Sequence, residues 1–186
     1  MNPIKNKKDL ESSIDIIRNF AYSYLEKYSP SKQQLKTHLY KKIIKKKLNI
    51  VSKKEIFNLI DIVIATLVDQ KLISDKYYSD FKSKSFLRRG YSLNKIRYNL
   101  IKKGIDQKYI KSSISKIMEN EANPDFFSAI KLCKRRRIGP VREEGNRPLF
   151  FKKDISILAR SGFSYEISKK ILDMPKDDFK KFCKML

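Results

Sequence analysis

Apolar residues recur along the chain with the period of an α-helix. The clearest stripe consists of Ile56, Ile60, Val63, Ile64 and Leu67, which follow i, i+4, i+7, i+8 and i+11 and share one helical face. Alternation of apolar and polar residues, the sign of a half-buried strand, is missing. The pattern predicts an all-α protein with helices near 10–27, 31–47, 52–70, 75–89, 92–103, 106–119, 124–137, 151–161, 164–173 and 175–185.

Helix starts are marked by capping residues. Ser31 is followed three residues later by a glutamine, and Ser52 by a glutamate, so both predict capping boxes in which hydroxyl and N3 side chain satisfy orphan N–H groups. Asp106, after the helix end at Gly104, is a further expected cap, and so is Asn123 before a proline. Only 139–148, with two glycines and two prolines, predicts a real loop.

The capped helices predict an internal repeat. Ser31 is followed by leucines at +4 and +8, and Ser92 by Ile96 and Leu100 at the same spacing, each serine with a tyrosine just upstream. A fainter copy begins at Ser164, after a Gly-Phe pair that matches the Gly-Tyr before Ser92. We expect an elongated array of tandem three-helix repeats with three units, 1–50, 51–119 and 120–186. Chance alignment of common serine-capped helices is the alternative.

Composition adds a strong positive charge. The 186 residues carry 43 Lys and Arg against 20 Asp and Glu, a formal net charge of +23. Such a surface attracts polyanions, which favours a nucleic acid or nucleoprotein partner, although an AT-rich genome also raises the lysine content. No apolar run approaches the ~18 residues of a membrane span. With two widely spaced cysteines, Cys133 and Cys183, we expect free thiols and a cytoplasmic protein, with no membrane partner.

The residues for catalysis are missing from the pattern. The single histidine, His38, lies on a lysine-rich helix without a cysteine or acid placed as a co-ligand, so a surface role is expected for it. No phosphate-binding glycine motif is present. The pair Asp177 and Asp178 fits the first turn of a helix, where acids complement the dipole. We therefore expect no enzyme activity, no cofactor and no metal.

Exposed cations are the candidate contact residues. On the helix after Ser92, one face is apolar, and the opposite face predicts a surface of lysines for phosphates and a tyrosine for stacking; a solvated face is the alternative. A run of three arginines, in a chain rich in lysine, suits bidentate contact with phosphate or carboxylate, with a helix-end role as the alternative. The lysine run 41–47 is the weakest candidate. The predicted contact residues are Arg88, Arg89, Lys95, Tyr98, Lys102, Arg135, Arg136 and Arg137.

Four stretches of the chain carry a family resemblance. They are Leu72-Ile73-Ser74-Asp75-Lys76-Tyr77-Tyr78, the segment from Arg88-Arg89-Gly90-Tyr91-Ser92 to Lys103-Gly104-Ile105, Lys134-Arg135-Arg136-Arg137-Ile138-Gly139-Pro140, and Leu158-Ala159-Arg160-Ser161-Gly162-Phe163-Ser164. In order and spacing they resemble the RecX family of RecA regulators, in its alphaproteobacterial form. The resemblance spans about residues 12–172. Ser74 in place of the usual first acid, and the lysines 45–47 without a glycine, depart from the family pattern.

The resemblance implies a tandem three-helix array without catalytic activity that lies along the groove of the RecA–single-stranded DNA filament. Tyr91, Leu93, Ile96 and Leu100 would hold the middle unit together. We expect a monomer that modulates recombination and the SOS response to DNA damage, with inhibition as the expected direction. The alternatives are a general nucleic-acid-binding helical protein or transcriptional regulator acting on DNA directly, and a helical adaptor whose charge only reflects genome composition.

Overall fold

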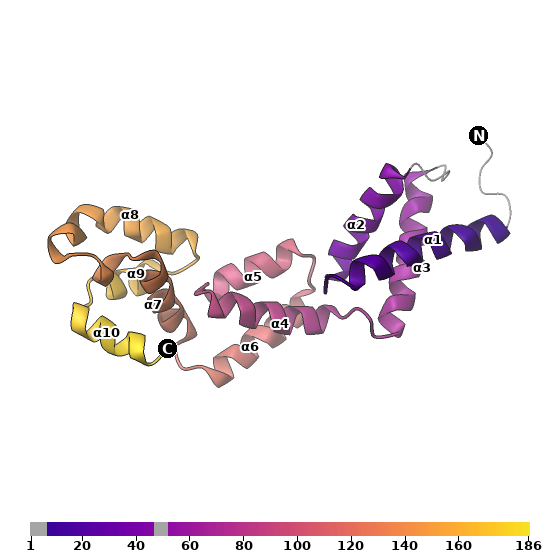
Figure 1. Cartoon of the computed structure of the whole chain (residues 1–186). Coiled ribbons are helices and arrows are strands. Elements are labelled where there is room, and N and C mark those ends of the chain that lie inside the picture. Colours follow the sequence, from indigo (N-terminus) through magenta and orange to yellow (C-terminus); the bar gives the residue numbers. More distant parts are fainter. Residues whose placement is uncertain (1–6, 47–51) are drawn as a thin grey trace. The chain divides into compact units, whose positions relative to one another are not determined.

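The computed structural model describes residues 7–46 and 52–186, with side chains from residue 11 onward. Over these ranges the chain is helical and has no β-strand, which confirms the all-α class (Figure 1). None of the described helices has the length and apolarity needed to cross a membrane. The helices are α1 (Lys7–Leu25), α2 (Lys32–Lys45), α3 (Lys53–Asp69), α4 (Asp75–Arg88), α5 (Leu93–Lys102), α6 (Gln107–Asn120), α7 (Pro124–Arg136), α8 (Arg147–Arg160), α9 (Tyr165–Leu172) and α10 (Lys176–Lys184).

One predicted helix start is wrong. Helix α8 begins at Arg147, whereas the sequence predicted a start near residue 151. Pro148 lies in the first turn, where a proline is tolerated because its missing N–H would have no partner within the helix. The stretch expected as loop is therefore shorter, and it contains two short 3₁₀ turns, Gly139–Val141 and Glu144–Asn146.

Most of the predicted caps are confirmed. Ser31 and Ser52 each form a complete capping box, and the carboxylate of Asp106 accepts a hydrogen bond from the Lys108 N–H at 2.8 Å. Asn123 was a wrong prediction: it has φ +52° and makes no side-chain cap bond. A side-chain cap needs an extended backbone at the N-cap, whereas Asn123 uses its tolerance of the left-handed region to turn the chain into Pro124.

Helices α1, α2 and α3 pack on one another in the first of two compact units, which consists of the residues up to 78 and 103–105. All five residues of the predicted α3 stripe are buried. Helix α3 packs against both α1 and α2, although the expected division placed it in the unit 51–119 with the helices that follow. The units 1–50, 51–119 and 120–186 and their number stay a prediction. The fully buried core includes Ile17, Leu35, Leu39, Ile60 and Leu67.

In this first unit the start of α2 is bonded to residues distant in the sequence. The hydroxyl of Ser31, which is fully buried, donates to the carbonyl of Lys103 at 2.7 Å. The N–H of Lys32, the first residue of α2, donates to the carboxylate of Asp75 at 2.9 Å. The cap thus satisfies its own helix and also holds a segment about 70 residues later in place.

The second compact unit consists of residues 79–102 and 106–186. Its main apolar core lies among α7, α8, α9 and α10, and it includes Ile130, Leu158 and Ile171, all fully buried. Cys133 is buried in the same core and Cys183 is half-buried at its edge; both are free thiols, as expected. Burial raises the pKa of Cys133 to about 12.

The start of α5 repeats, within the second unit, the bonds made at the start of α2. The hydroxyl of Ser92, fully buried, accepts from the Lys95 N–H at 3.1 Å and donates to the carbonyl of Ser161 at 2.9 Å. The N–H of Leu93 donates to the carboxylate of Asp125 at 2.7 Å. A serine cap, an aspartate from a later helix and a carbonyl from a later turn therefore recur in both units, and they fix α5 against α7 and the α8–α9 turn.

Candidate nucleic-acid interface

Helix α5 has one buried and one exposed face, as predicted. Leu93, Ile96 and Leu100 are buried, whereas Tyr98 is 48% exposed. The ammonium groups of Lys95 and Lys102 lie 5.5 and 4.7 Å from the centre of the Tyr98 ring, within the range of cation–π attraction. A hydrogen bond from Lys102 and the charges of both lysines lower the pKa of Tyr98. The structure therefore brings the three predicted contact residues of α5 together at the surface, with Tyr98 and Lys102 exposed and Lys95 half-buried.

The corresponding helix α2 does not share this surface. Counted from its serine cap, α2 carries Gln34, Thr37 and Lys41 where α5 carries Lys95, Tyr98 and Lys102. The buried positions of the two helices are equivalent, with an apolar residue at +4 and +8 after each serine, all fully buried. Both helices have a lysine at +10, so the surfaces differ at +3 and +6: the fold needs the buried pattern, and it does not need Lys95 or Tyr98.

The predicted pair Arg88 and Arg89 ends α4 and is exposed. The next residue, Gly90, has φ +74°, and a Cβ there would lie 2.8 Å from the Ser128 carbonyl oxygen and 3.3 Å from the Cβ of Lys131. Glycine is required both for the positive φ and for this close approach. The chain directly after the two arginines therefore passes beside α7 at Lys131.

The predicted arginine run ends the same helix α7. Arg135, Arg136 and Arg137 are all exposed, and Arg137 takes the left-handed conformation as the C-cap. Arg135 is one helical turn beyond Lys131, so the α4 end and the arginine run contribute to neighbouring surface. None of the predicted contact cations forms an ion pair with a carboxylate in the described part of the chain.

Sequence reasoning missed one cation of this surface, Arg160. It is exposed in the last turn of α8, directly before the turn whose Ser161 carbonyl accepts from Ser92. Gly162 of that turn has φ +85°, and a Cβ there would lie 3.1 Å from the Cβ of Lys95. The one signal in the sequence was that Arg160 precedes a copy of the serine cap. It could not place Arg160 near α5, because the bond that holds this turn against α5 joins two residues 69 apart.

The Gly/Pro loop before α8 is held by a buried ion pair that the sequence did not predict. Asp154, 1% exposed, accepts two hydrogen bonds from the Arg142 guanidinium, both at 2.8 Å, and one from the Gly139 N–H at 2.9 Å. Arg142 also lies 4.5 Å from the centre of the Phe150 ring. These bonds hold the loop against α8, and they fix the position of the chain directly after the arginine run.

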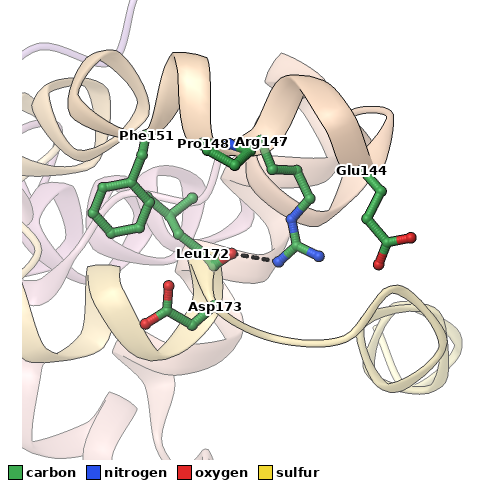
Figure 2. A pocket seen from close by; sticks show the side chains of 6 residues that line it. All are labelled: Glu144, Arg147, Pro148, Phe151, Leu172 and Asp173. Carbon is green, nitrogen blue, oxygen red and sulfur yellow. Dashed lines mark hydrogen bonds between the residues drawn. The ribbon is translucent and has the colours of Figure 1, made fainter.

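A shallow pocket lies beside this loop, and its main polar side chain, Arg147, is engaged in bonds that hold the fold together. Figure 2 shows Arg147 reaching the carbonyl of Leu172, to which it donates at 2.6 Å; it also donates to the Met174 carbonyl at 2.8 Å. These are carbonyls at the end of α9, which have no partner within the helix. The guanidinium of Arg147 thus caps the C-terminal end of α9.

The remaining candidate, His38, is half-buried and stacked on Tyr24, with ring centres 3.9 Å apart. Burial and the nearby Lys42 lower its pKa, so the imidazole is neutral at physiological pH. Among the described residues no three His, Cys, Asp or Glu side chains lie together as metal ligands would. Of the lysine run 41–47, residues 41, 45 and 46 are exposed, and Lys47 lies outside the described residues.

The fold and the surface define a basic, all-α protein whose recognisable chemistry is a set of exposed cations. No protein-family model matches the chain. It is 28% identical over 169 residues to the regulatory protein RecX of Myxococcus xanthus, covering 90% of this chain and 89% of that protein. It is 24% identical over 161 residues to the regulatory protein RecX of Agrobacterium fabrum, covering 87% and 84%.

Two solved structures share the fold. The crystal structure of RecX from Lactobacillus salivarius matches with a TM-score of 0.59 and 22% identity, over 88% of this chain and 98% of that chain. A crystal structure of regulatory protein RecX matches with a TM-score of 0.58 and 20% identity, over 91% and 78%. The chain is thus similar in sequence to RecX proteins over nearly its whole length, and it shares the fold of the solved RecX structures.

Proposed function

We propose that the protein is a non-enzymatic regulator of DNA repair and recombination that binds the RecA–single-stranded DNA filament and inhibits its activity. What carries the proposal is a set of surface cations on α4, α5 and α7 that form no ion pair with a described carboxylate, in a chain that resembles regulatory RecX proteins over nine tenths of its length. A filament groove lined with phosphate is complementary to such a surface.

Three groups of residues have roles in this proposal. Lys95 and Lys102 neutralise phosphates, and Tyr98 between them offers a ring to a base. The arginine run 135–137 binds phosphates or carboxylates of the filament bidentately. The two arginines at the end of α4 add to the same basic surface.

The test is a titration of the DNA-dependent ATP hydrolysis of the cognate recombinase. Wild-type protein should slow hydrolysis at substoichiometric amounts. Replacing Arg135, Arg136 and Arg137 by alanine should weaken inhibition, whereas replacing Lys41, Lys45 and Lys46 by alanine removes the same charge from α2 and its C-terminal end and should leave inhibition close to wild type. Wild-type protein that neither binds the filament nor affects hydrolysis at any ratio would overturn the proposal.

The alternative, direct binding to DNA, makes a different prediction. A general nucleic-acid-binding protein should bind naked oligonucleotides tightly, with an affinity that falls steeply with salt as phosphate contacts release counterions. A filament regulator should bind naked single strands more weakly than the filament at the same salt. Anisotropy measurements with a labelled oligonucleotide, with and without recombinase, separate the two.

A further inference from the structure

One segment of the chain departs from its basic character. The stretch between Lys116 and Lys131 contains no lysine or arginine, although the whole chain has 43, and it carries Glu119, Glu121 and Asp125. This stretch forms the end of α6, the turn after it and the first half of α7. Because charges are screened over about 8 Å at cellular salt, these acids set the local potential even on a basic protein.

A cleft of about 690 Å³ opens at this segment, within the second compact unit. Three phenylalanines from α7 and α10 form its aromatic part: the ring centre of Phe126 lies 5.5 Å from that of Phe127 and 5.0 Å from that of Phe182, both edge to face. Met118, 59% exposed, and Met174 also line it. Flexible thioethers beside aromatic rings adapt to an apolar side chain, and the volume is that of a ligand site.

The polar groups of the cleft favour a positively charged occupant. Glu121, exposed at the C-cap of α6, and Asp125, half-buried and already accepting from the Leu93 N–H, both line the cleft. The C-terminal end of α6 adds the negative end of its dipole. The one cation in the lining is Lys170, whose ammonium already lies 5.5 Å from the centre of the Phe126 ring.

We propose that this α6–α7 cleft docks a segment of a protein partner in which an apolar side chain stands next to lysine or arginine. Nucleic acid does not fit, because phosphates would meet the two carboxylates. A second copy does not fit either, because two chains of +23 repel each other. The inference deepens the proposed function and rests on it for the partner: the cleft contacts the protein of the filament, and the cationic surfaces contact its DNA.

Methyl NMR of methionine tests the proposal directly. Of the four methionines of the chain, Met118 and Met174 line the cleft and Met185 does not, so protein labelled with ¹³C-methyl methionine carries two reporters and an internal control. The probes are a tetrapeptide of lysine, phenylalanine, leucine and lysine, its counterpart with glutamate in place of lysine, a single-stranded oligonucleotide, and the DNA-free recombinase. We expect both reporters to shift with the basic peptide and the recombinase, and with neither of the other probes.

Each other outcome has a definite meaning. Reporters that shift equally with both peptides, shift with the oligonucleotide, or shift with no probe overturn the proposal. Reporters that shift with the basic peptide while the recombinase fails to bind anywhere leave the cleft standing and overturn the proposed function instead. The two failures are therefore distinguishable in one series of spectra.

Charge reversal at the rim gives a second, independent measurement. Glu121→Lys replaces an exposed acid of the cleft, and it should weaken binding of the basic peptide by about three- to tenfold, the range expected when a solvent-exposed attraction becomes a repulsion. Glu26→Lys makes the same charge change at an exposed residue after α1 and should leave the peptide affinity unchanged. Equal affinities of the two variants would overturn the electrostatic part of the proposal.

Discussion

The hydroxyl of Ser92 makes two bonds that can be separated by mutation. It caps its own helix by accepting from the Lys95 N–H, and it donates to the carbonyl of Ser161 in the α8–α9 turn. Ser164 provides a matched control in the same unit: it caps α9 by accepting from the Ile167 N–H at 3.3 Å, but it is exposed, and its hydroxyl donates to no other element of the part of the chain that the structure describes. Ser92→Ala and Ser164→Ala therefore both remove a helix cap, and only Ser92→Ala also removes a hydrogen bond to another element, the one to the Ser161 carbonyl.

The expected losses follow from these contacts. Loss of a serine N-cap costs about 1 kcal/mol of unfolding free energy, and this applies to both variants. Ser92→Ala also removes the 2.9 Å bond to the Ser161 carbonyl, which keeps only the longer bond from the Ser92 N–H at 3.4 Å, and this loss costs about 1 kcal/mol more. We therefore expect a loss of about 2 kcal/mol for Ser92→Ala and about 1 kcal/mol for Ser164→Ala.

Urea titration followed by far-ultraviolet circular dichroism measures both losses. If the two compact units unfold in separate steps, the step that Ser164→Ala shifts is the one to compare. Equal losses in the two variants, within about 0.5 kcal/mol, would refute the assignment of the Ser161 bond as stabilising. A larger loss in the control than in Ser92→Ala would refute it more strongly.

Three further predictions concern buried or charged groups. Arg142→Ala should lower the unfolding free energy in urea by about 3–5 kcal/mol, because it leaves a buried carboxylate unpaired. In native protein at pH 8, Cys183 should react with a thiol reagent and Cys133 should not, since the pKa of Cys133 is raised to about 12 and its side chain is fully buried; denaturant should make both react. In an alkaline titration at 295 nm, Lys102→Ala should move the onset of tyrosinate absorption to higher pH, because Lys102 lowers the pKa of Tyr98 by favouring its phenolate.

Local signals in the sequence predicted the helices well. A serine or aspartate cap, an apolar stripe and a terminal glycine each act within one or two turns, so the starts at Ser31, Ser52, Ser92 and Asp106 could be read without tertiary information. Asn123 shows the limit of this reasoning. Its residue type suits a cap and a left-handed turn equally, and only the path of the chain decides between them.

Bonds between distant residues could not be predicted in the same way. The buried pair of Arg142 and Asp154 joins a loop to the middle of a helix, and nothing in the spacing of the two residues marks them as partners. The approach of Gly90 to α7 likewise depends on how two helices pack. The sequence could therefore name Arg88, Lys95 and the arginine run as surface cations, but it could not place Arg160 or Lys131 beside them.

The comparison of α2 with α5 separates what the fold requires from what the surface offers. Both helices start at a fully buried serine whose hydroxyl reaches a later turn, and both receive a carboxylate from a later helix at their first N–H. A feature that recurs in both units is explained by packing. Lys95 and Tyr98 have no equivalent in α2, are not needed to bury either helix, and form the cationic surface of α5. The capping serine is thus a structural element, and any binding specificity must come from the positions where the two helices differ.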